Sequence, residues 1–249
     1  MMRLKPRFVS GLLLLAAIFL LGSVTARRVF AQAPADSSKK LKVYISVDME
    51  GVAGVVTADQ LLPSGFEYER FRHFMTDETL AAVRAANEAG ASEIVVSDSH
   101  GNGENLLIEV FPKNVRIVRA WPRHGGMMAG LDSSFSAAIF IGYHASTTNP
   151  KGVRAHTFSS AHYARVALNG NAVTEGEYNA AYAGAKGVPV IFVSGDDAAV
   201  EDTRMGVMTE LGPIGDANLD LSMLDVHSHG SRIQPSVEGW PRELADQSV

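Results

Sequence analysis

The sequence predicts an α/β domain in which a mostly parallel β-sheet lies between helices, in three layers. Apolar runs of strand length alternate with helical patterns, and glycine separates a helix from the next strand. The 249 residues, of which 46% are hydrophobic and 20% charged, are enough for one sizeable domain or two small ones. We see no internal repeat and no coiled-coil heptad.

The first elements form a βαβ unit. Residues 41–48 are an apolar run of strand length, and a second such run begins at Ile94. Between them, residues 68–89 carry apolar side chains near helical spacing, at Phe71, Met75, Leu80, Val83 and Ala86. Gly90 ends this helix, as a C-terminal glycine commonly does. The order strand, helix, strand calls for a parallel sheet.

More strands and a second long helix follow. The later strands are predicted over 115–118, 137–142, 165–170 and 188–194. The strand over 165–170 enters an Asn-Gly turn, which is a strong hairpin signal, so a short hairpin insertion is expected there. The helix is predicted over 175–184, where one face carries Tyr178, Ala181, Tyr182 and Ala185.

The N-terminus resembles a secretory leader. Residues 1–7 carry three basic side chains, and residues 9–21 are apolar and rich in leucine. Ala31-Gln32-Ala33 offers a small-x-small cleavage site, with Val24-Thr25-Ala26 as a rival. We expect residues 1–33 to be a signal peptide or an N-terminal anchor. The protein is then exported to the periplasm or medium, or held at the membrane by an uncleaved leader.

The remaining boundaries follow from composition. Residues 34–40 read as a polar linker, and residues 41–202 form the predicted α/β domain. From 203 to 249 the hydrophobic periodicity decays, so we predict an irregular, poorly structured tail.

Charge and cysteine content exclude several kinds of site. The formal net charge is −5 with no basic stripe, which makes nucleic acid an unexpected partner. The chain has no cysteine, so disulfides, thiolate metal sites, a cysteine nucleophile and a bacterial lipoprotein anchor are excluded. Any bound metal must therefore be held by histidine, aspartate and glutamate.

Ionisable side chains follow three of the apolar runs. Asp48 and Glu50 end the first, Asp98-Ser99-His100 ends the second, and His144 ends the run over 137–142. The carboxyl ends of parallel strands share one crevice, where open α/β sheets bind ligands. Asp48 and Glu50 are two apart on a strand and point the same way, so they repel unless a cation lies between them. Taken alone, the acids also fit a solvated strand end, and the histidines also fit a helix cap or a satisfied position in the core. Together they favour zinc or a similar divalent ion.

Three further positions leave alternatives open. Glu175 begins the helix over 175–184, where an acid also complements the helix dipole, and Glu177 competes with it for a site role. His156 lies in a predicted loop. It could be a proton donor, base or nucleophile beside a metal, or an ordinary surface histidine. Asp196 follows the last strand and either positions a loop or caps a helix.

The motifs, taken in order, resemble the zinc-dependent D-aminopeptidase family of the dipeptide-transport-operon type. The resemblance runs from about Lys42 to Asp197. It is carried by Ser46-Val47-Asp48-Met49-Glu50-Gly51, Asp98-Ser99-His100, Gly142-Tyr143-His144-Ala145, His156, and Glu175 with Asn179.

This resemblance implies two zinc ions per chain, with Asp48 bridging them. The matching ligand positions are Asp48, Glu50, His100, His144 and Glu175. It also implies that His156 is the catalytic nucleophile; a proton shuttle beside an attacking water is the physical alternative. The implied substrates are short peptides with an N-terminal D-residue, such as D-Ala-D-Ala. The implied assembly is a ring-shaped homo-oligomer.

The sequence departs from the family pattern at both ends. The leader is foreign to a cytosolic family, and no match to the family's further helical portion follows about Thr203, which suggests a truncation. Two other functions therefore stay open. One is another binuclear metal hydrolase, such as an amidase or a phosphoesterase, although no glycine-rich phosphate cradle precedes a helix. The other is an inactive, truncated remnant of the family.

Overall fold

The computed structural model describes residues 40–168, 170–209 and 225–228. The predicted leader over residues 1–33 and nearly all of the linker over 34–40 lie outside the described residues. Within the described part of the chain, no helix combines the length and the hydropathy that a membrane span requires.

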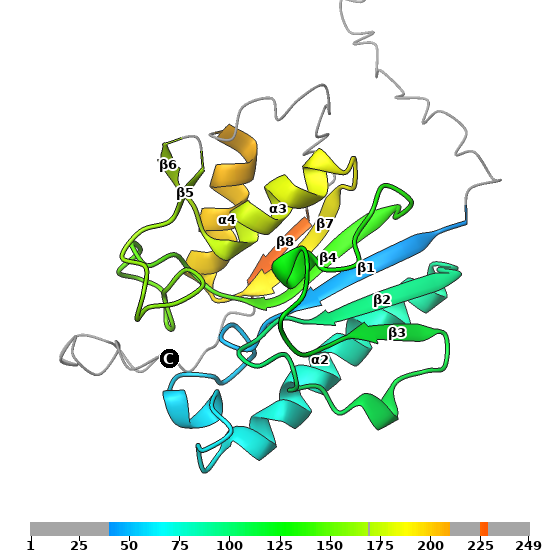
Figure 1. The fold of residues 1–249 in the computed structure, drawn as a ribbon, viewed down its shortest axis with the longest axis horizontal. Helices are drawn as coiled ribbons and strands as arrows, with labels where there is room; N and C mark the ends of the chain where they lie inside the picture. Colours follow the sequence, from blue (N-terminus) through cyan, green and yellow to red (C-terminus); the bar gives the residue numbers. More distant parts are fainter. Residues whose placement is uncertain (1–39, 169, 210–224, 229–249) are drawn as a thin grey trace, which may run out of the picture. The chain divides into compact units, whose positions relative to one another are not determined.

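A six-stranded parallel sheet in the order β3-β2-β1-β4-β7-β8 forms the centre of the fold (Figure 1). Its strands are β1 (Lys42–Val47), β2 (Glu93–Asp98), β3 (Val115–Val118), β4 (Ala137–Tyr143), β7 (Val190–Gly195) and β8 (Asp225–Ser228). A separate two-stranded antiparallel hairpin consists of β5 (Ala167–Leu168) and β6 (Asn171–Ala172). The predicted parallel sheet and hairpin insertion are confirmed, although the hairpin strand predicted over 165–170 has only two residues.

Helices cover both faces of the sheet, which confirms the three layers (Figure 1). On one face lies α2 (Tyr68–Glu88), and on the other lie α3 (Glu175–Ala185) and α4 (Asp197–Thr209). Side chains alternate along each strand, so β1 sends Val43, Ile45 and Val47 toward α2 and Tyr44 toward α3. The sheet is therefore apolar on both sides, as expected for parallel strands buried between helices.

Short 3-10 turns complete the connections. They are η1 (Ala58–Gln60), η2 (Ile108–Val110) and η3 (Gly126–Met128). The last of these covers the α3 side of the sheet, where Met127 and Met128 are buried.

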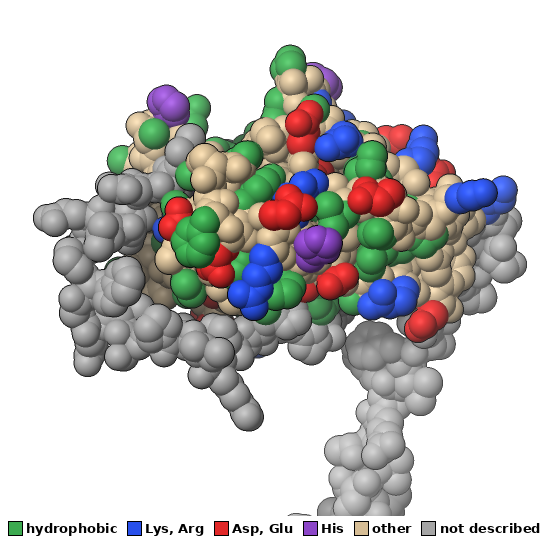
Figure 2. All heavy atoms as spheres, turned by 90° about the horizontal axis from the view of Figure 1, so that it is seen from below, with side chains coloured by type: hydrophobic (Ala, Val, Ile, Leu, Met, Phe, Trp, Pro, Cys, Tyr) green, Lys and Arg blue, Asp and Glu red, His purple; other side chains and the backbone are tan. Residues whose placement is uncertain are grey.

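Figure 2 shows the lower face of the molecule, on which acidic and basic side chains are interspersed, so this face has no patch of one sign among its described residues.

The predicted end of the domain at Asp202 needs correction. Helix α4 continues through that position to Thr209, and β8 pairs in parallel with β7 within the stretch predicted as irregular. Over residues 197–204, where the side chains of α4 are described, the buried apolar residues are Ala199 and Val200, and so short a stripe gives little periodicity in the sequence. The other residues of the predicted tail, 210–224 and 229–249, lie outside the described residues.

Glycine lets the chain pass close to itself at the carboxyl ends of the central strands. The amide of Gly51 donates to the carbonyl of Gly142 at 2.7 Å, just beyond β1. Gly142 has a φ of +70°, and a Cβ atom there would lie 2.3 Å from the carbonyl oxygen of Asp48. Backbone contacts therefore hold Asp48 beside the segment that carries His144, independently of any side-chain interaction.

This close approach predicts that Gly142→Ala is more destabilising than an alanine at a left-handed glycine in open space. Gly90 is the matched control, because its φ is +87° and nothing lies within 4 Å of its Cβ position. We expect Gly90→Ala to lower the free energy of unfolding by about 1–2 kcal/mol through backbone strain alone. Gly142→Ala adds steric overlap, for a total of about 2–5 kcal/mol. Urea unfolding of both variants measures the difference, and equal losses would show that the close approach does not constrain the fold.

Candidate metal centre

The sequence suggested that Asp48 and Glu50 lie on the first strand. In the structure, both lie just beyond the end of β1. β1 ends at Val47, but the amide of Asp48 still donates to the carbonyl of Ile141 at 2.8 Å, so the chain stays beside β4. The following turn directs both carboxylates to the same ring. His100 Nδ1 lies 3.3 Å from Asp48 Oδ1 and 2.9 Å from Glu50 Oε2. The expected shared direction is therefore present, produced by a turn and not by strand alternation.

His100 is positioned by the loop that follows β2. The Asp98 carboxylate accepts hydrogen bonds from the amides of Asn105 and Leu106 and from Asn105 Nδ2, at 2.6, 2.8 and 2.8 Å. Asn105 Nδ2 also donates to the carbonyl of His100 at 2.7 Å. Asp98 therefore folds this loop, while His100 is the member of Asp98-Ser99-His100 that faces the carboxylates.

His144 and Glu175 join the same cluster from the other half of the sheet. His144 Nε2 lies 3.4 Å from both Asp48 Oδ2 and Glu175 Oε1. Glu175 is the first residue of α3, and its Oε1 also accepts the amide of Phe158. Glu177 instead completes the capping box of α3 with Thr174. The two acids that the sequence could not separate thus have different roles in the structure.

His156 is buried in the same cluster and is not a surface residue. Its ring stacks on that of His144, with centroids 3.9 Å apart. Its Nε2 lies 3.9 Å from both Glu50 Oε1 and Glu175 Oε1. The amide of His156 donates to the carbonyl of Ala145 at 3.1 Å, which holds its loop beside the end of β4.

Asp196 supports this loop and caps a helix at the same time. One carboxylate oxygen accepts the amide of Ala199 at 2.8 Å, at the start of α4. The other accepts the amide of Val153 at 3.0 Å, three residues before His156. Both of the roles that the sequence left open for Asp196 are therefore present.

The three histidines present one ring nitrogen each to the carboxylates. The other nitrogen faces a backbone carbonyl: that of Leu61 for His100, of Ala145 for His144 and of Arg154 for His156, at 3.0, 3.0 and 2.9 Å. A carbonyl only accepts, so these nitrogens carry the proton. In the neutral form of each ring, the inward nitrogen has a lone pair that faces a carboxylate oxygen, an arrangement typical of metal-binding histidines.

The pKa values of the cluster reflect its burial and the short distances between its charged groups. Burial raises the pKa of Asp48, and the charge of Glu50 raises it further. Burial opposes protonation of His100 and His144, but the carboxylates of Glu50, Glu175 and Asp48 outweigh it and hold both histidine pKa values well above the usual range. Protons therefore occupy these nitrogens when no metal does, and metal binding displaces them.

The donor set fits a divalent metal. Ligand atoms of Asp48, Glu50 and His100 lie within 4.8 Å of one another, and so do those of the second group, His144, His156 and Glu175. Asp48 Oδ2 and His144 Nε2 are buried without a hydrogen-bond partner, although they face each other. Buried polar atoms of this kind are costly unless a cation or proton binds them. Carboxylate oxygen and imidazole nitrogen are ligands of zinc.

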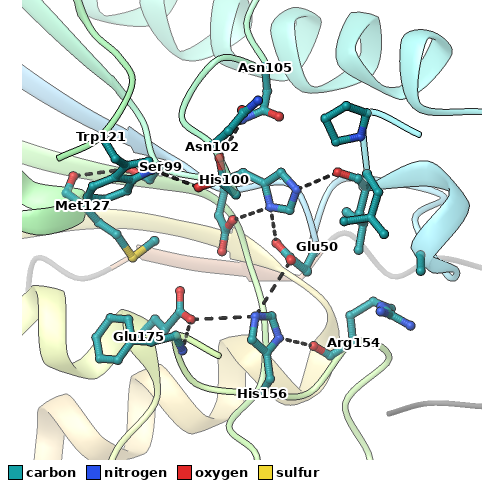
Figure 3. Close-up of a pocket in the computed structure, with 17 residues that line it drawn as sticks. Glu50, Ser99, His100, Asn102, Asn105, Trp121, Met127, Arg154, His156 and Glu175 are labelled. Atoms are coloured by element: carbon teal, nitrogen blue, oxygen red, sulfur yellow. Dashed lines mark hydrogen bonds and ion pairs between the residues drawn. The ribbon is translucent and has the colours of Figure 1, made fainter. Parts of the chain in front are cut away.

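A pocket of about 580 Å³ opens onto this cluster (Figure 3). Its polar side is formed by the cluster, and its apolar side by the loop after β1 and by residues from other loops. The lining includes Asp48, Glu50, His100, His156, Glu175, Arg154, Leu61, Leu62, Pro63, Trp121 and Phe158. Arg154 and Asn105 were missed in the sequence because neither lies at a strand end and only the folded loops bring them to the site.

A family comparison identifies the class of the chain. Residues 41–210 match the family model described as D-aminopeptidase. The chain belongs to this D-aminopeptidase family. The resemblance read from the motifs is thereby confirmed for nearly the whole of the described domain.

Two comparisons give relatives within the family. A D-aminopeptidase of Bacillus subtilis (strain 168) is 37% identical over 167 residues, which are 66% of this chain and 59% of that protein. A solved structure described as a zinc-dependent D-aminopeptidase from Bacillus subtilis, a self-compartmentalizing protease, matches with a TM-score of 0.62 and 34% identity. This match also covers 66% of this chain and 59% of the chain in that structure. The chain thus spans about three-fifths of the length of these relatives.

The different roles of Glu175 and Glu177 give a matched test. Glu175→Gln removes a charge that faces His144. We expect zinc affinity to fall at least about 10-fold, because even mutations of residues that only contact a metal ligand lower metal affinity by that factor. Glu177→Gln keeps an oxygen for the capping box and leaves zinc affinity unchanged. Competition titration against a chromophoric zinc chelator measures both. The assignment fails if the two variants lose affinity equally.

Proposed function

We propose that this protein is a zinc-dependent aminopeptidase that hydrolyses short peptides with an N-terminal D-residue. The observation that carries the proposal is the convergence of three carboxylates and three histidines at the end of a 580 Å³ pocket. Membership of the D-aminopeptidase family and the zinc dependence of the Bacillus subtilis relative support it.

Five residues would hold two zinc ions. Asp48, Glu50 and His100 would hold one ion. His144 and Glu175 would hold the other together with Asp48, which also faces His144, while His156, the third member of that group, is assigned to proton transfer. When bound, zinc polarises a peptide carbonyl and lowers the pKa of a water ligand to about 7. The proposed count of two ions is supported by Asp48, whose oxygens face different histidines, His100 and His144.

His156 would move the proton that peptide hydrolysis requires. Its Nδ1 donates to the carbonyl of Arg154, so Nε2 is free to accept a proton beside Glu50 and Glu175. The same nitrogen can return that proton to the leaving amine, which must be protonated before it departs. Stacking on His144 fixes the ring for this role.

The shape of the pocket supports short substrates. Ligand pockets of small molecules occupy about 300–1,000 Å³, and this one lies within that range. A peptide whose free amino end lies at the inner end of this pocket would have its first peptide bond beside His156. By analogy with the self-compartmentalizing relative, we propose a homo-oligomer. Export through the leader-like segment stays a prediction.

Two variants of the full chain test the separate roles of ligand and proton carrier. We expect Glu50→Ala to lose zinc and activity, because it removes a charged ligand. We expect His156→Ala to keep zinc and to lower kcat by about 10²- to 10⁴-fold, the usual contribution of a proton-transfer residue. Zinc content by mass spectrometry and release of D-alanine from D-Ala-D-Ala, against L-alanine from L-Ala-L-Ala, are the measurements.

Exposed residues of the same types serve as controls. Glu88→Ala and His73→Ala on α2 should retain both zinc and activity. Loss of zinc from His156→Ala would make His156 a ligand and overturn its catalytic assignment. Zinc with activity on a phosphate ester and none on D-peptides would favour another binuclear hydrolase. Wild-type protein without zinc would favour the inactive remnant.

A further inference from the structure

Arg154 is a buried cation in the pocket that the proposed chemistry does not use. The residue is 5% exposed, and it lines the pocket two positions before His156. Among the described residues that line the pocket, it is the only arginine or lysine. In Figure 3, Arg154 and Glu175 lie on opposite sides of His156.

One edge of its guanidinium group has no partner. Nε and Nη2 are both buried, and neither makes a hydrogen bond. These two nitrogens lie on the same edge of the planar group, where their N–H bonds point in parallel. Arginine does not lose its proton in proteins, so the charge cannot be removed to relieve the cost of burial. An unpaired edge of this kind is expensive unless a ligand binds it.

Glu50 does not satisfy this edge. Its charge acts on Arg154, but it is not a hydrogen-bond partner of Nε or Nη2. The Glu50 oxygens are directed instead to His100 and His156, at 2.9 and 3.9 Å. A role for Arg154 as a counter-ion alone would therefore leave its two parallel donors unused.

Two parallel N–H donors match the two oxygens of a carboxylate. We propose that Arg154 binds the free C-terminal carboxylate of a short peptide substrate and thereby determines specificity for unblocked short peptides. This inference rests on the proposed function, in which the amino end of the peptide lies at the metal cluster. A peptide held at both ends would be placed with its first peptide bond beside His156.

The test compares a peptide acid with its amide. Wild-type protein is assayed with D-Ala-D-Ala and with D-Ala-D-Ala amide, which differ only in the group that Arg154 would bind. We expect Arg154→Met to lower kcat/KM for the acid by about 10- to 100-fold, mostly through KM, and to change the amide by less than about 3-fold. Arg154→Lys keeps the charge without the paired donors and should fall between. Arg70→Met, at an exposed arginine of α2, is the control.

Binding and metal content provide readouts that do not depend on turnover. Calorimetry with D-Ala-D-Ala in which the scissile amide is replaced by a methylene-amine should show the same acid-specific loss of affinity. Zinc content should be unchanged in all three variants. If Arg154→Met folds poorly, Arg154→Lys carries the comparison.

The outcomes separate this inference from the proposed function. A loss confined to the acid supports carboxylate binding. Equal losses for acid and amide overturn it and assign Arg154 to the reacting carbonyl or to structure, while turnover of both by the wild type leaves the proposed function standing. If zinc-loaded wild type hydrolyses neither peptide, both proposals fail.

Discussion

The site depends on the burial of three carboxylates in contact with three imidazole rings. Asp48, Glu50 and Glu175 are all buried, and they approach one another through the rings of His100, His144 and His156. Buried carboxylates repel one another and are poorly solvated, so they require positive charge. Protonated histidine supplies it only in part, because the unpaired atoms of Asp48 and His144 still face each other. A divalent cation bound to these side chains would supply the missing positive charge.

The fold brings these groups together by ordinary means. Parallel pairing places the carboxyl ends of β1, β2 and β4 at one edge, and glycine at positions 51 and 142 lets the chain segments approach there. Each imidazole is then oriented by a backbone carbonyl. The geometry of the cluster is thus set largely by backbone contacts, with Asp98 and Asp196 holding the two loops.

The strand ends were predictable because strand and helix periodicities differ and because glycine marks the ends of the helix. Asp48, His100 and His144 could be assigned to one crevice on that basis. The roles of Glu175 and Glu177 could not be separated, since either acid suits a first helical turn and only the capping box with Thr174 decides. Arg154, Asn105 and the burial of His156 depend on how loops fold over the sheet. Helix α4 beyond Asp202 and strand β8 gave too little periodicity to be recognised.

Anomalous X-ray scattering at the zinc edge, from crystals of the zinc-loaded protein, would locate the cations directly. The account predicts two anomalous peaks that share Asp48, one also in contact with Glu50 and His100 and the other with His144 and Glu175. Peaks away from these residues, or none in the crevice, would contradict it.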